Sequence, residues 1–169
     1  MRLITSGTAT VFWLSPVLCW QAYGELIFLE FTVDFSPLGL SLVDLDTWFW
    51  VDGPGSDPIT GTSAGGVVAV ATPQHIELDP GDGVVPMTCE WTVSESDACT
   101  HAYQRASVNG PLTSDGGDPA YEARARLVFG IHFEFGGDVL ELPGLPDEFV
   151  TDWQSGAVPV AEVQAVVTD

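Results

Sequence analysis

Two cysteines and a histidine lie close together in the sequence and can support either redox or metal chemistry. Cys89 and Cys99 flank a short acidic loop, and His101 follows the second cysteine by two residues. Zinc normally takes four ligands in tight spacing, and no second ligand pair accompanies these three residues. If Cys19 is removed with an export signal, Cys89 and Cys99 remain as an even pair, and such a pair in an exported chain favours a disulfide. We therefore predict a Cys89–Cys99 disulfide, with a metal site built from Cys89, Cys99 and His101 as the alternative.

Carboxylates gather around an Asp-Pro-Gly-Asp-Gly sequence that predicts a tight turn. Gly81 and Gly83 permit positive φ on either side of Asp82, and the Asp82 carboxylate can accept backbone N–H groups there. Calcium needs six to eight oxygen ligands, and the carboxylates here do not form an EF-hand pattern. Asp82 is thus predicted to brace the turn, and calcium held by Glu77, Asp79 and Asp82 is the weaker alternative.

Paired carboxylates can also perform acid and base catalysis, when one of them is protonated in an apolar pocket. The possible pairs are Glu77 with Asp82 and Asp147 with Asp152, but nothing in the sequence holds either pair together. The chain contains no Gly-x-Ser-x-Gly and no His-Glu-x-x-His sequence. We predict that the protein is not an enzyme and that it has no catalytic residues; a small carboxylate-dependent hydrolase is the alternative.

Four tryptophans could stack on the rings of a sugar: Trp48, Trp50, Trp91 and Trp153. Tryptophans are more often part of a core, and strand alternation is expected to bury one of Trp48 and Trp50. A flat pair of exposed rings would favour glycan binding.

Composition limits the class of partner. The chain has 169 residues, is 46% hydrophobic and carries a net charge of −20, with 24 acidic residues, four arginines and no lysine. An acidic surface repels phosphate backbones, so nucleic-acid binding is disfavoured. Without lysine there is no P-loop for a nucleotide. The length predicts one domain, over residues 25–169.

Residues 1–24 resemble a secretory signal peptide, with Arg2, an apolar run and an Ala22-Tyr23-Gly24 ending. An edge strand over residues 3–11, or a start codon placed too far upstream, would explain the same segment. Leu18 before Cys19 argues against a lipoprotein signal, and no apolar run of about 18 residues could span a membrane. The predicted location is secreted or in the cell envelope.

Alternation of side chains predicts the strands. From Tyr121 to Phe135 every second residue is apolar or aromatic, a period of two that is typical of a half-buried antiparallel strand. Pro73 is expected to interrupt a pair of strands around it. No stretch has a convincing helical period. Other strands are predicted over residues 25–35, 40–43, 47–51, 67–71, 75–78, 88–93, 100–105, 139–142 and 157–167.

These elements predict an all-β fold, an antiparallel β-sandwich of about seven or more strands. The order of its motifs resembles the PKD (polycystic kidney disease) domain, an immunoglobulin-like sandwich of extracellular proteins. The resemblance covers residues 36–169 and also includes a group of exported, uncharacterised actinobacterial proteins with a PKD-like domain. Leu78 replaces the tryptophan usual before the turn, and the connection over residues 106–119 is long. The residues that carry the motif are Gly81, Asp82, Gly83, His101, Tyr103 and Tyr121.

The resemblance implies a non-catalytic exported or cell-envelope module that binds protein or glycan, or serves as a scaffold. Its partner is not identified by the sequence, and no cofactor is expected apart from calcium. The main alternative is a calcium-stabilised component of a cell wall or appendage. In that alternative the ion would be gathered by four carboxylates, those of Asp79, Asp82, Asp115 and Asp118.

Overall fold

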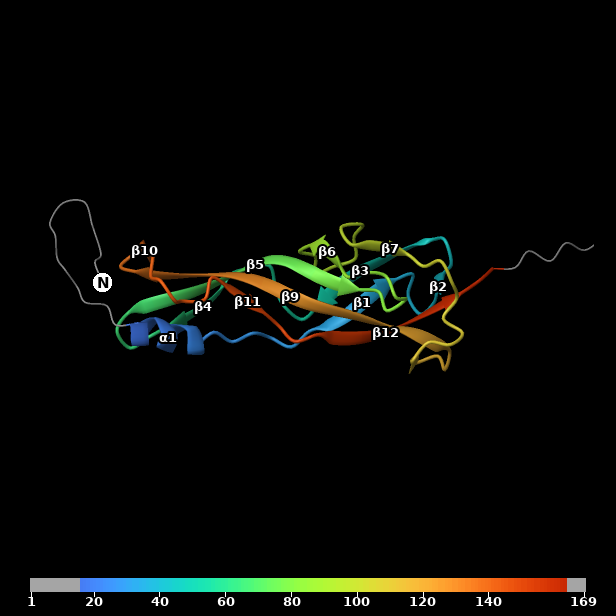
Figure 1. Cartoon of the computed structure of the whole chain (residues 1–169), viewed down its shortest axis with the longest axis horizontal. Coiled ribbons are helices and arrows are strands. Elements are labelled where there is room, and N and C mark those ends of the chain that lie inside the picture. The colour runs from blue at the N-terminus through green and yellow to red at the C-terminus, as the bar shows by residue number, and fades with distance from the viewer. Residues whose placement is uncertain (1–15, 164–169) are drawn as a thin grey trace, which may run out of the picture. The chain divides into compact units, whose positions relative to one another are not determined.

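A computed structural model describes residues 16–163 of the chain (Figure 1). These residues divide into two compact units. Among these residues, unit 1 comprises 16–28, 57–73 and 129–150, and unit 2 comprises 29–56, 74–128 and 151–163. Residues 1–15 of the predicted signal peptide lie outside the described part. No helix within residues 16–163 has the length and apolar character needed to cross a membrane.

Unit 2 contains a three-stranded antiparallel sheet in the order β1-β3-β7. Its strands are β1 (Thr32–Ser36), β3 (Asp46–Asp52) and β7 (Thr100–Ala102). The residues of β3 alternate strictly between buried and more exposed positions, and this is the pattern expected for a sheet with one face in the core.

The facing sheet of unit 2 is built on β12 (Gln154–Ala161), which pairs with β2 (Ser41–Leu42) on one side and the first part of β9 (Pro119–Phe135) on the other. Next to β9 lies β5 (Val67–Asp79). Two short strands, β6 (Met87–Glu90) and β8 (Leu112–Thr113), pair with β5 and β9.

The two sheets of unit 2 pack face to face, so the all-β sandwich prediction is confirmed. Strands β1 and β12 approach closely, since a Cβ at Gly156 would lie 2.9 Å from the carbonyl oxygen of Val33. The core between the sheets is formed by buried side chains from both, which include Val33, Phe49, Val51, Ile76, Leu78, Tyr103, Ala123, Ala125 and Val158.

Unit 1 contains helix α1 (Pro16–Gly24), β4 (Ile59–Thr62), β10 (Asp138–Leu140) and β11 (Glu148–Val150), together with the remaining parts of β5 and β9. Here β4 pairs with β5, and β10 and β11 pair with β9. Phe28 stacks on Phe149 at 4.0 Å between ring centroids and meets Phe129 edge-on at 5.0 Å. These three rings form an aromatic cluster in this unit.

The long alternating strand is confirmed. In β9 the side chains of Ala123, Ala125, Leu127, Phe129, Ile131 and Phe133 are all buried, as the period of two requires. The predicted return strand after it is also present, because β10 pairs with residues 133–135.

The predicted interruption at Pro73 is wrong, because β5 runs unbroken through it. On one side β5 pairs with β4 through residues 68–71 and with β6 through residues 75–78. Pro73 lies between these two partners, so its missing N–H costs no pairing bond on that side of the strand.

The predicted bounds of the first and last strands are also wrong, and one helix was not predicted. Residues 25–31 are not a strand, and β1 begins only at Thr32. The final strand begins at Gln154 and ends at Ala161, while residues 164–167 of the prediction lie outside the described part. Residues 16–24 form a helix that the sequence does not predict, since they carry no amphipathic period.

Candidate functional site

The outer face of the three-stranded sheet presents two tryptophans from one strand. Because side chains two residues apart share a face, Trp48 and Trp50 point the same way, while Phe49 and Val51 fill the core. Trp48 is 37% exposed and Trp50 is half-buried. The expectation that alternation buries one of Trp48 and Trp50 is therefore wrong, since it is the residues between them that are buried.

Hydrogen-bonding side chains flank both rings. Trp48 lies between Ser36 of β1 and Thr100 of β7, and Trp50 lies opposite Asp34 of β1. All three flanking residues are half-buried. We call these five residues, Asp34, Ser36, Trp48, Trp50 and Thr100, the tryptophan face. It combines flat aromatic surface with hydroxyl and carboxylate groups.

A groove of about 340 Å³ adjoins Trp50. Asp34 and Phe35 of β1, the exposed Leu38 and the loop at residues 114–116 contribute to its lining. Asp115 belongs to this loop. The tryptophan face thus continues into a concave surface that could hold more than one ring of a ligand.

The other two candidate tryptophans, Trp153 and Trp91, do not lie on the three-stranded sheet. The guanidinium groups of Arg126 and Arg124 lie 4.7 and 5.6 Å from the centroid of the Trp153 ring, in cation–π geometry. Trp91 lies in the loop after β6 and is half-buried, with its indole nitrogen enclosed. Neither ring belongs to the tryptophan face.

The two arginines over Trp153 also pair with carboxylates. Arg124 binds Asp79, and Arg126 binds Glu77, each at 2.5 Å. The hydrogen bond to Asp79 raises the pKa of Arg124. Sequence reasoning missed this network, although the alternation of β9 places both arginines on one face.

Asp82 and His101, far apart in sequence, are brought into contact. Oδ2 of Asp82 lies 2.8 Å from Nε2 of His101, and both side chains are only about a tenth exposed (10% and 11%). Asp82 also braces its own turn as predicted, because Oδ1 accepts the N–H of Val84 at 3.4 Å. Gly81 and Gly83 have φ of +83° and +93°. A Cβ at Gly81 would lie 2.2 Å from the carbonyl oxygen of Glu122, so this turn requires glycine.

The two motif tyrosines stack on each other at 5.1 Å between ring centroids. Tyr103 is fully buried and donates its hydroxyl hydrogen to the carbonyl oxygen of Pro80 at 3.0 Å. His101 meets the Tyr103 ring edge-on. The Tyr121 hydroxyl lies 3.1 and 3.2 Å from the carbonyl oxygens of Arg105 and Ala106. These contacts tie the turn, β7 and β9 together.

The three carboxylates at and just before the Gly-Asp-Gly turn each have a basic partner. Glu77, Asp79 and Asp82 pair with Arg126, Arg124 and His101 respectively. Within residues 16–163 no three His, Cys, Asp or Glu side chains converge as a metal site would require. These ion pairs engage Glu77, Asp79 and Asp82 within the fold.

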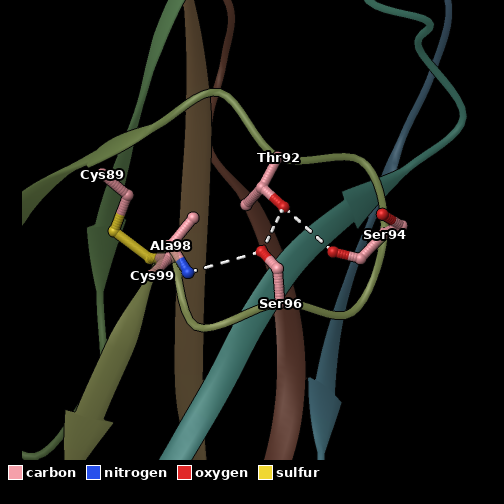
Figure 2. Close-up of a disulfide and its surroundings, with 6 residues drawn as sticks. All are labelled: Cys89, Thr92, Ser94, Ser96, Ala98 and Cys99. Carbon is pink, nitrogen blue, oxygen red and sulfur yellow. Dashed lines mark hydrogen bonds between the residues drawn. A yellow bond between two sulfur atoms is a disulfide. The ribbon is translucent and has the colours of Figure 1, made fainter.

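Cys89 and Cys99 form the predicted disulfide, with their Cα atoms 5.1 Å apart (Figure 2). Cys89 belongs to β6, which pairs with β5, while Cys99 precedes β7 and accepts the N–H of Phe49 in β3. The bond therefore links the two sheets of unit 2. The alternative metal site with His101 is wrong, because both sulfur atoms are used in the disulfide.

Hydroxyl groups hold the loop between the cysteines. The Thr92 hydroxyl donates to the carbonyl oxygen of Ser94 at 2.9 Å and lies 3.0 Å from the Ser96 hydroxyl, which accepts the N–H of Ala98 (Figure 2). Val51 donates its N–H to the carbonyl oxygen of Thr92, so the loop is also attached to β3.

No protein-family model, no curated protein and no solved structure matches this chain. The case for a function therefore depends on the geometry of the site itself.

Proposed function

We propose that this protein is a non-catalytic, PKD-like module that binds glycans through the tryptophan face. The observation that carries the proposal is the shared outward direction of Trp48 and Trp50 on β3. Side chains two residues apart on a strand are separated by about 7 Å, so the two rings can meet neighbouring parts of one extended ligand.

The surroundings of the rings favour a sugar over an apolar partner. Sugars present C–H faces that stack on aromatic rings and hydroxyl groups that need hydrogen-bond partners. Asp34, Ser36 and Thr100 supply such partners beside the rings. The three strands of this sheet contain no lysine or arginine, so acidic sugars would find no cation there.

The proposal also includes a PKD-like type of sandwich and export of the protein from the cell. The contacts among Asp82, His101, Tyr103 and Tyr121 agree with the structural role that the PKD resemblance implies for them. A disulfide that joins the two sheets favours export, because such bonds persist in oxidising compartments.

Affinity electrophoresis in gels that contain single neutral polysaccharides tests the proposal. We expect at least one polysaccharide to retard the protein. Trp48→Ala and Trp50→Ala should each weaken the retardation about tenfold, because each removes a stacked ring. Trp20→Ala is the matched control, since Trp20 is 50% exposed and lies in unit 1, outside the tryptophan face.

Three outcomes would contradict the proposal. Unchanged migration across a broad set of neutral polysaccharides, or equal retardation of the Trp48→Ala protein and the wild type, would remove the glycan assignment. New reducing ends in a polysaccharide incubated with the protein would overturn its non-catalytic character.

A further inference from the structure

A second pocket, of about 540 Å³, lies in unit 2 away from the rings of Trp48 and Trp50. Its volume is in the usual range for small-molecule sites. The polar side chains that line it come from the loop after β7, the Gly-Asp-Gly turn, β9 and the segment after β12. They are Gln104, Arg105, Asn109, Asp82, Tyr121 and Glu162.

Buried contacts hold the loop that forms one wall of this pocket. Ser107 is 2% exposed, its hydroxyl lies 2.6 Å from the carbonyl oxygen of Pro119, and it accepts the N–H of Val160 at 2.8 Å. The hydroxyl of Tyr121 donates to the backbone carbonyls of Arg105 and Ala106. A wall fixed in this way lowers the entropic cost of ordering it around a ligand.

Arg105 indicates the charge of the group that this pocket would bind. Arg124 and Arg126 each pair with a carboxylate, whereas within residues 16–163 Arg105 forms no salt bridge. Its side chain is exposed at the pocket. A guanidinium group suits a carboxylate, which it can bind through two parallel hydrogen bonds.

The remaining charges indicate that the ligand must also carry a cation. The chain has a net charge of −20, which repels a simple anion. Glu162 and Asp82 line the same pocket as Arg105, and Asp82 is already engaged by His101. Glu162 is exposed and is the carboxylate available to an ammonium group.

We propose that this pocket binds a zwitterion, a free amino acid or a short peptide, with its carboxylate on Arg105 and its ammonium group on Glu162. Val43 and Val108 also line the pocket and supply aliphatic surface for a small apolar side chain. The proposal concerns a site of its own and does not depend on the glycan assignment.

Calorimetric titration with four probes tests the proposal: valine, alanyl-valine, N-acetyl-alanyl-valine and alanyl-valine amide. We expect valine or alanyl-valine to bind with a Kd of about 1 mM or tighter. Acetylation removes the cation and amidation removes the anion, so each should weaken the binding of the dipeptide about tenfold or more. Tighter binding of valine would indicate a free amino acid as the ligand. Tighter binding of alanyl-valine would indicate a short peptide.

Variants then assign the two charges. Arg105→Gln and Glu162→Gln should each weaken binding of the better probe about tenfold, while the melting temperature stays unchanged because both side chains are exposed. The matched controls are Arg124→Gln and Glu148→Gln, which do not line the pocket. No binding by valine or alanyl-valine, equal binding by a blocked peptide, or equal losses in the controls would overturn the proposal.

Discussion

Tyr103 illustrates how a single buried phenol holds the motif region together. Its hydroxyl bonds to the carbonyl oxygen of Pro80, and its ring contacts those of His101 and Tyr121. Burial raises the pKa of Tyr103, and the nearby charge of Asp82 raises it further. The folded protein therefore keeps this phenol protonated at pH values where an unfolded chain would release the proton.

The difference between the pKa values of Tyr103 in the folded and the unfolded chain makes the stability of the protein depend on pH under alkaline conditions. Because the pKa is raised on folding, the contribution of Tyr103 is fully present below its ordinary value of about 10 and is lost as pH rises beyond it. We predict that the free energy of unfolding, measured by chemical denaturation, falls steadily above about pH 10. Tyr103→Phe should cost about 1–2 kcal/mol at pH 8, through the lost hydrogen bond, and should reduce the alkaline slope. Parallel curves for the two proteins would contradict this origin of the slope.

Helix α1 shows how a short element can contribute to a unit without a strong sequence signal. Cys19 and Ala22 are fully buried, and a Cβ at Gly61 of β4 would lie 2.3 Å from the carbonyl oxygen of Ala22. Burial raises the pKa of the Cys19 thiol. The other two cysteines form the disulfide, so thiol labelling reports on this helix alone.

We predict that Cys19 reacts slowly with a thiol reagent in the native protein, since the reacting species is the thiolate and burial disfavours it. Ala22→Glu places a charge at a fully buried position and should accelerate labelling more than about tenfold by releasing the helix. Gln21→Glu is the matched control, because it adds the same charge on the exposed side of α1 and should leave the rate unchanged. Rapid labelling of the wild type would show that α1 does not stay packed on β4.

The elements that the sequence predicts well are those whose signal is local. The alternation of β9 and the glycine turn at residues 81–83 depend on neighbouring residues, and both are confirmed. Helix α1 was missed because nine residues with two buried positions give no amphipathic pattern. The pocket at Arg105 was missed because segments distant in sequence come together there. The outward direction of both Trp48 and Trp50 could have been predicted, since it follows from the same alternation that identified β9.

The charge of the whole chain sets a condition on any partner. The net charge of −20 corresponds to an isoelectric point of about 4.1. Two of the described arginines are already paired with carboxylates. The field around the protein should therefore oppose the approach of anionic polymers to the tryptophan face, and salt should weaken this opposition.

This effect of charge can be tested by comparing the binding of two polymers. One is a neutral glycan that binds the protein, and the other is a carboxymethylated derivative of the same glycan. At low salt we expect the derivative to bind at least about tenfold more weakly, because its carboxylates meet Asp34 and the acidic surface instead of a cation. The Debye length falls from about 10 Å at 0.1 M salt to about 3 Å at 1 M. The difference between the two polymers should therefore narrow in 1 M NaCl, while the binding of the neutral glycan changes little. Stronger binding of the derivative at low salt would instead point to a cationic contact, and its loss in the Arg105→Gln variant would locate that contact at the second pocket.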